Sequence, residues 1–181
     1  MLWPFNRFKN PGVPSRGTIE AIYGMVVAQA REPVFYTSLN VPDTVDGRFD
    51  MLLLHLWLVL RHLRETEGGE GLSQALFDRF CEDMDGNLRE MGVGDLTVPK
   101  RMQAFGEAFY GRTAAYDLAR AGGENDLAEA IGRNVLNGTH PESAHSLAQY
   151  VMAAESALVR TDAAILAGGT WRFPQPLPPA T

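Results

Sequence analysis

The chain has 181 residues, enough to form the core of one ordinary domain. Hydrophobic residues make up 45% and charged residues 21%, a balance that is typical of folded globular proteins and argues against disorder throughout. The formal net charge of -6 argues against broad, charge-driven binding to nucleic acid, so we expect no specific nucleic-acid partner. The single cysteine, Cys81, excludes an intrachain disulfide.

Apolar residues recur at helical spacing along the chain, and the alternation of a strand is almost absent. We predict a first helix over residues 18–31, ended by Pro33, and then a connector over residues 34–43 that holds a short helical turn or an extended piece. Asp46 can cap a long helix over residues 48–65, which is apolar on nearly every side. Its apolar run is about half of the roughly 20 residues that span a membrane, so we predict a core helix.

A helical corner is predicted over residues 92–99. The helix before the corner covers residues 72–91, with Met91 as the last member of its apolar stripe. Gly92 and Gly94 end that helix, because glycine accepts the backbone conformation that closes a helix. The sequence therefore predicts a firm turn between two helices.

The helix after the corner is capped by Asp95 or Thr97 and runs to about residue 121, with Pro99 in its first turn, where a missing N–H costs little. Two further helices are predicted after it. They cover residues 124–137 and residues 143–167. Together these elements predict an all-α fold, a single compact domain of about six or seven helices over residues 18–168.

The two ends of the chain are expected to lie outside this domain, as an N-terminal segment over residues 1–17 and a proline-rich tail over residues 169–181. The N-terminal segment lacks the apolar run and cleavage site of a secretory signal. It combines large apolar side chains with basic ones: Leu2, Trp3, Phe5, Phe8, Arg7 and Lys9. This segment either docks or frays, or it contacts a membrane surface or a partner. The tail docks through Trp171 and Phe173 or extends into solvent.

The residues that suggest metal chemistry do not have the required spacing. An acidic cluster begins at Asp83, but position six of a calcium loop would be Leu88 and position twelve would be Gly94, where a glycine and a glutamate are needed. His55 and His62 lie two helical turns apart, too far to chelate one ion directly. We interpret the acidic cluster as a solvated helix face and the histidines as hydrogen-bonded or exposed, with no metal and no cofactor.

A catalytic site is also not evident. Cys81 has no cysteine or histidine at ligand spacing and is better interpreted as an inert buried thiol than as a nucleophile. The sequence contains no phosphate-binding loop, dinucleotide glycine pattern or serine elbow. We therefore expect a protein that is not an enzyme.

Arg112 does not fit the helix that carries it. It falls on the apolar stripe formed by Phe105, Phe109 and Tyr116, so its guanidinium must extend to the surface, pair with a carboxylate or contact a partner.

Three segments resemble the ubiquinol-cytochrome c chaperone family: residues 47–56, residues 76–80 and residues 84–112. The most specific part is the phrase MGVGDLTVPKR at residues 91–101, followed by FYGR at residues 109–112. The resemblance extends over roughly residues 18 to 140.

This resemblance implies a chaperone that binds nascent or newly inserted cytochrome b and promotes assembly of the respiratory ubiquinol-cytochrome c reductase, complex III. It also implies a ribosome or a small co-chaperone as further partners. The expected place is the bacterial cytoplasm, peripheral at the cytoplasmic face of the inner membrane, or alternatively the matrix side in mitochondria. The alternative function is a non-enzymatic helical scaffold or regulatory adaptor for a soluble partner.

The candidate partner-binding residues surround the predicted corner. Several are basic or aromatic, and protein interfaces favour Arg and Tyr side chains, and Lys less than these. The candidates are Gly92, Gly94, Asp95, Pro99, Lys100, Arg101, Tyr110 and Arg112.

Overall fold

A computed structural model describes residues 14–177 of the chain. The membrane or partner contact expected of the N-terminal apolar and basic side chains lies outside the described residues, as do the last four residues of the tail. Within residues 14–177 the chain forms helices and no strands. The predicted all-α fold is confirmed.

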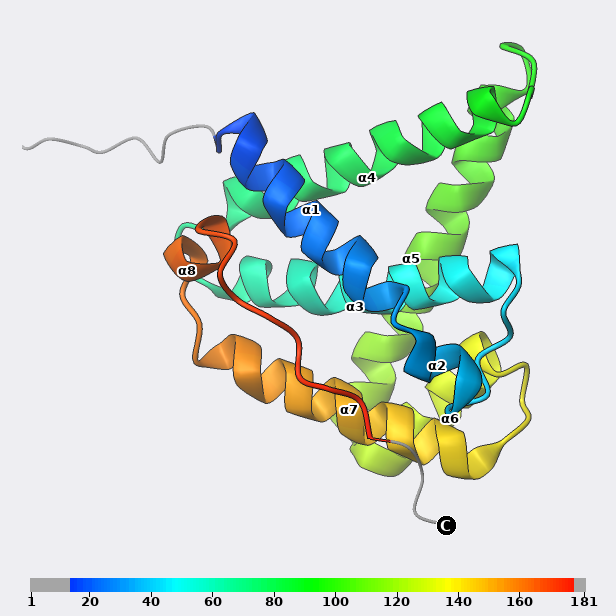
Figure 1. The fold of residues 1–181 in the computed structure, drawn as a ribbon, viewed down its shortest axis with the longest axis vertical. Helices are drawn as coiled ribbons and strands as arrows, with labels where there is room; N and C mark the ends of the chain where they lie inside the picture. Colours follow the sequence, from blue (N-terminus) through cyan, green and yellow to red (C-terminus); the bar gives the residue numbers. More distant parts are fainter. Residues whose placement is uncertain (1–13, 178–181) are drawn as a thin grey trace, which may run out of the picture.

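Eight helices follow one another in the described part of the chain (Figure 1). Two of them, α2 and α8, have five residues each, and the other six form the body of the domain. Their bounds are α1 Arg16–Ala30, α2 Pro33–Thr37, α3 Val45–Glu65, α4 Glu70–Glu90, α5 Val98–Gly122, α6 Glu124–Val135, α7 Pro141–Val159 and α8 Ala163–Ala167.

The central element is α3, which packs against α1, α4, α5, α6 and α7. Its side chains are buried on nearly every side, and Leu54, His55 and Trp57 have no exposed surface. This is the core helix that the apolar run predicts. Among the described residues no helix combines the length and the apolar character needed to cross a membrane.

The start of α3 differs from the prediction. The helix begins at Val45, and its cap is Thr44, whose side-chain oxygen accepts a hydrogen bond from the Gly47 N–H at 3.1 Å. Asp46 lies in the first turn instead, where a negative charge favours the helix dipole. Gly47 leaves room for the preceding loop, because a Cβ at this position would lie 2.0 Å from the Pro42 carbonyl oxygen.

The predicted last helix over residues 143–167 is wrong, because it is two helices. After α7 ends at Val159, the Thr161 N–H donates to the Leu158 carbonyl, and the chain turns. Asp162 then caps α8 by accepting a hydrogen bond from the Ile165 N–H at 2.8 Å. An aspartate that caps a new helix competes with continuation of the old one.

The tail docks on the body of the domain rather than extending into solvent. Figure 1 shows it turning back from α8 across the molecule. Phe173 is buried, with its ring centroid 5.1 Å from that of His55 and 4.7 Å from that of Trp171. No hydrogen bond joins the backbone of residues 171–177 to another segment of the described chain, so apolar side chains fix this tail.

Candidate functional site

The predicted corner joins α4 to α5 at one end of the molecule (Figure 1). Gly92 has a φ of 80°, and the N–H of the next residue, Val93, donates to the Leu88 carbonyl at 3.0 Å. This closure of α4 requires the left-handed conformation that glycine favours. Pro99 lies in the first turn of α5, as predicted. Part of the sequence pattern of residues 84–112 therefore serves to form the turn between α4 and α5.

Charges at the corner divide into a paired set and an unpaired set. Arg89 bridges Asp85 at 2.6 Å and Asp95 at 2.5 Å, so Asp95 is bound to the end of α4. Lys100 and Arg101 are exposed and form no ion pair with any described residue. Asp95 is also exposed, at 88% of its side-chain surface, but its carboxylate is paired with Arg89.

Arg112 points inward to a carboxylate. Its Nη2 atom lies 2.7 Å from Oδ1 of Asp50 on α3, and the two side chains are only 27% and 10% exposed. Burial raises the pKa of Asp50 to about 6, although the positive charge of Arg112 opposes the rise. Of the three roles that the sequence left open for Arg112, pairing with a carboxylate is the one that the structure shows.

Tyr116 lies near this pair. Its hydroxyl group is buried without a hydrogen-bond partner among the described residues. Burial raises the pKa of Tyr116, and the charge of Asp50 adds to the effect. We name Asp50, Arg112 and Tyr116 the α3–α5 polar cluster. The same two helices are also joined by Asp117 of α5, which accepts a hydrogen bond from the Trp57 Nε1–H at 2.8 Å and lies 3.8 Å from Arg61.

Tyr110 lies on another side of α5. Its ring is exposed and packs beside Phe109 at 5.4 Å and beside Phe77 of α4 at 6.2 Å. Positions two apart do not share a helix face, so Tyr110 and Arg112 point apart. Arg112 also lies roughly 20 Å along α5 from Pro99, at about 1.5 Å per residue. The eight predicted residues therefore do not form one continuous surface.

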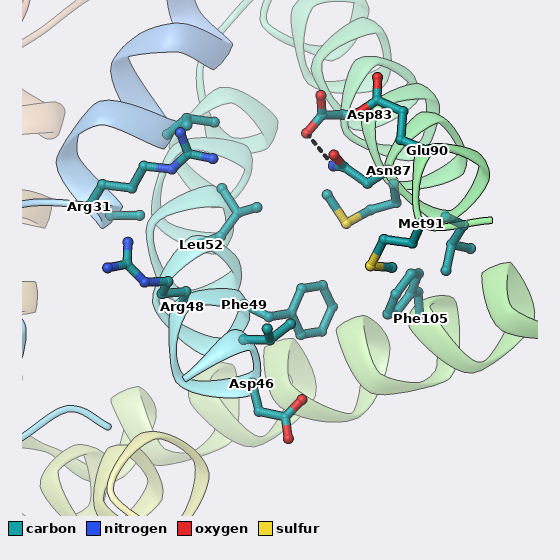
Figure 2. Close-up of a pocket in the computed structure, with 15 residues that line it drawn as sticks. Arg31, Asp46, Arg48, Phe49, Leu52, Asp83, Asn87, Glu90, Met91 and Phe105 are labelled. Carbon is teal, nitrogen blue, oxygen red and sulfur yellow. Dashed lines mark hydrogen bonds between the residues drawn. The ribbon is translucent and has the colours of Figure 1, made fainter. Parts of the chain in front are cut away.

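A groove that the sequence did not predict lies between α1, α3, α4 and α5 (Figure 2). We name it the α3–α4 groove. Its volume is about 520 Å³. The larger apolar side chains along it are Val27, Val45, Phe49, Leu52, Met84, Leu88, Met91 and Phe105.

One end of this groove is formed by two partly buried aromatic rings and an exposed methionine. The rings of Phe49 and Phe105 lie 5.1 Å apart, and Figure 2 shows Met91 beside them. The expectation that Met91 points inward is wrong, because 68% of its surface is exposed. The helix α4 ends at Glu90, so Met91 already belongs to the turn and leaves the buried stripe.

Charged residues flank the apolar floor. Arg31 and Arg48 lie on one side and Asp83 and Glu90 on the other, as Figure 2 shows. Arg48 is paired with Asp43 at 2.7 Å. An apolar floor between charged edges fits an amphipathic segment, which places its apolar face in such a groove.

Asp83 accepts a hydrogen bond from the Tyr23 hydroxyl at 2.9 Å and lies 3.5 Å from Arg79. The predicted solvated acidic face at this position is thus partly a contact between α1 and α4. In residues 14–177 no three histidine, cysteine or acidic side chains converge as metal ligands would.

His55 is hydrogen-bonded inside the core. Its Nδ1 lies 2.8 Å from the Met51 carbonyl oxygen and its Nε2 lies 2.7 Å from the Tyr150 hydroxyl. Burial lowers the pKa of His55 to about 4, so the ring is neutral at pH 7. His62 contacts the Thr161 carbonyl oxygen at 2.9 Å. Both are hydrogen-bonded histidines, as predicted.

Cys81 is half-buried rather than buried, and burial raises the pKa of its thiol. A raised pKa keeps the group as the less reactive thiol.

The sequence pattern of the ubiquinol-cytochrome c chaperone family matches residues 37–173. The chain belongs to this family. The match begins and ends later than the range of roughly residues 18 to 140 over which the resemblance extends, and it reaches Phe173 of the docked tail. The family pattern therefore includes α7, α8 and the start of the tail.

Named relatives agree with the family. The chain is 28% identical over 120 residues to ubiquinol-cytochrome-c reductase complex assembly factor 1 of Xenopus laevis, covering 65% of this chain and 60% of that protein. It is 28% identical over 149 residues to protein CBP3, mitochondrial, of Saccharomyces cerevisiae, covering 78% of this chain and 44% of that protein. The chain thus spans about half the length of these relatives.

A solved structure shares the fold. The crystal structure of the Cbp3 homolog from Brucella abortus superposes with a TM-score of 0.78 at 36% identity. The likeness covers 88% of this chain and 90% of that one. The helical architecture is therefore that of a bacterial member of the same group.

Proposed function

We propose that this chain is an assembly chaperone for the respiratory ubiquinol-cytochrome c reductase and that it binds newly made cytochrome b. Family membership and the names of the relatives support the assembly role. The observation that supports the binding role is the α3–α4 groove, an apolar groove beside the corner between α4 and α5. Residues 91–101, the part of the sequence that most resembles the family, form this corner. The proposed activity is binding rather than catalysis.

The groove binds an apolar helical stretch of the client and shields it from water. Phe49 and Phe105 supply rigid aromatic surface, which contributes strongly to binding at interfaces. Met84 and Met91 supply flexible thioethers that adapt to different side chains. The charged edges then contact the polar residues that flank the client's apolar stretch.

The predicted corner contributes its exposed basic residues. Lys100 and Arg101 contact acidic or polar groups of the client next to the groove, and Gly92, Gly94 and Pro99 shape the turn. Asp95 acts within the corner, through Arg89. Arg112 acts indirectly, because it binds α5 to α3 and so fixes Phe105 opposite Phe49.

Because the proposed client is inserted into a membrane, the chaperone acts beside that membrane. We place this chain at the cytoplasmic face of the bacterial inner membrane, for which the equivalent in mitochondria is the matrix side. Contacts with a ribosome, a small co-chaperone or the membrane surface stay predictions.

Photocrosslinking in cells tests the binding role. A photoreactive amino acid at Met91 or Lys100 should capture cytochrome b. The same amino acid at Glu142, an exposed residue in the first turn of α7, should not capture it. Capture of other proteins alone from Met91 and Lys100 would contradict the proposed client.

A deletion strain separates the chaperone from the scaffold or adaptor. Loss of the cytochrome b-containing complex, with other respiratory complexes unchanged, is the expected result. A strain that assembles this complex normally would overturn the proposed function.

A further inference from the structure

We propose that the α3–α4 groove binds a short amphipathic segment that has Lys or Arg beside its apolar face, as segments on the cytoplasmic side of a membrane protein do. This inference rests on the proposed function and names the part of the client that the groove binds. Two places on the rim of the groove support it. Each combines an exposed apolar side chain with an acidic side chain that has no ion-pair partner within residues 14–177.

The first place is the start of α3 and the second is the end of α4. Val45 is 80% exposed, and Asp46, which is also exposed, follows it. At the end of α4 the exposed Glu90 precedes Met91. All four residues line the groove, and Figure 2 shows Asp46 and Glu90 on opposite sides of Phe49. A segment that covers Val45 and Met91 therefore passes beside both carboxylates.

The other charged side chains that line the groove do not balance these two acids. Arg48 and Asp83 already form the ion pairs described above. Arg31 of α1 is exposed and without an ion pair in the described part of the chain, and it adds one positive charge to the rim. Lys100 and Arg101 of the corner do not line the groove. The unpaired charges on the rim are therefore mostly negative, which favours a basic segment over an acidic one.

The length of the groove limits the segment that it can hold. The α4 side extends from Asp83 to Met91, a distance of roughly 12 Å at 1.5 Å per helical residue. A helix that spans a membrane is about 30 Å long. The groove therefore covers about two turns of a bound helix, which suits a short amphipathic segment rather than a whole spanning helix.

A membrane-inserted client presents basic segments on one side. The cytoplasmic loops of membrane proteins have an excess of Lys and Arg near the ends of the spanning helices. A segment there that also has an apolar face needs a membrane surface or a protein groove to cover that face. A chaperone at the cytoplasmic face therefore meets the basic side of its client.

Peptide binding to the full chain tests the inference. The probe is a short fluorescein-labelled helical peptide with Leu and Phe on one face and Lys on the other. The comparison peptide has Glu in place of each Lys. Fluorescence anisotropy at low salt should show that the Lys peptide binds more tightly, by on the order of tenfold. Added salt should reduce the difference, because it screens charges at the surface.

Charge variants locate the attraction. Asp46→Asn combined with Glu90→Gln removes the two unpaired carboxylates and should weaken binding of the Lys peptide by on the order of fivefold. The matched control is Glu67→Gln combined with Glu142→Gln, which removes two exposed acidic groups outside the groove and changes the net charge equally. The control should bind the Lys peptide within about twofold of the unaltered chain, since salt screens distant charges.

An equal loss in the two variants would overturn the inference, because the attraction would then come from the net charge of the whole chain. Equal binding of the two peptides, tighter binding of the Glu peptide or binding of neither would overturn it as well. These outcomes leave the proposed function intact if Met91 and Lys100 still capture cytochrome b in cells. Loss of that capture from the unaltered chain would instead contradict the proposed function.

Discussion

Arg112 of α5 and Asp50 of α3 form an ion pair with 2.7 Å between Nη2 and Oδ1, and the same two helices carry Phe105 and Phe49, whose ring centroids lie 5.1 Å apart. The pair explains a basic residue on an apolar stripe. It also gives Arg112 a structural role, distinct from the partner contact proposed for Arg101.

Replacing Arg112 should destabilise the fold. Arg112→Ala leaves the Asp50 carboxylate buried without its partner, and breaking such a pair costs about 3–5 kcal/mol. Protonation of Asp50 reduces that loss at low pH. Urea unfolding measures the change, and Arg101→Ala is the control, expected within about 0.5 kcal/mol of the unaltered chain. An Arg112→Ala protein that unfolds at the original urea concentration would show that the pair contributes nothing.

His55 should make the fold less stable in acid. Because its pKa is about 4 in the fold and about 6.5 when unfolded, only the unfolded chain gains a proton as the pH falls between these values. The free energy of unfolding should decrease by roughly 3 kcal/mol over this range. His55→Gln should be less stable at pH 7 but should lose less on acidification. Urea unfolding at pH 7 and pH 5 tests this.

Asp50 should act in the opposite direction. Its pKa of about 6 in the fold lies above its ordinary value, so the folded chain gains the proton first as the pH falls. Its contribution to the free energy of unfolding therefore grows on acidification from pH 7 towards pH 4. Asp50→Asn should remove this gain, so the variant should lose more stability than the unaltered chain over the same range. Equal pH profiles would contradict the raised pKa.

Met91→Asp should separate binding from folding. The side chain is 68% exposed, so we expect a change in stability within about 0.5 kcal/mol. A charge beside Phe49 and Phe105 should reduce cytochrome b capture by on the order of tenfold. Pull-down from membranes and thermal unfolding measure the two effects. Val159→Asp, at a residue that is 75% exposed at the end of α7, is the matched control and should bind normally.

Gly47→Ala should destabilise the fold, because its Cβ would lie 2.0 Å from the Pro42 carbonyl oxygen and the loop before α3 would have to move. A cost above about 1 kcal/mol is typical of such overpacking. Gly24→Ala in α1 meets nothing within 4 Å and should stabilise the helix by about 0.5–1 kcal/mol. Thermal unfolding of the two variants should therefore give shifts of opposite sign.

Much of the fold was predictable because local signals determine it. Gly92 and Pro99 specify the corner through their own backbone preferences, and the apolar run of α3 specifies a buried helix. Thr44 and Asp162 changed the expected helix boundaries, because several nearby polar residues can each act as a cap and the sequence does not rank them.

The site was less predictable, since it depends on residues far apart in the chain. Arg112 was visible as a misfit, but its partner Asp50 belongs to another helix, and local periodicity does not pair them. The α3–α4 groove is similar, because Phe49, Met91 and Phe105 each look like core residues until the helices are packed. Only the packing shows that they leave a channel.

The chain is synthesised from its N-terminus, so the docked tail is among the last parts of the fold to form. Phe173 covers His55 with ring contacts, and these residues belong to the last and an early part of the described chain. The helix α3 therefore leaves the ribosome well before Phe173, which covers His55 of that helix, has been synthesised. Products that stop short of Phe173 lack the ring that covers His55, so cellular proteases should degrade them faster than chains that include it.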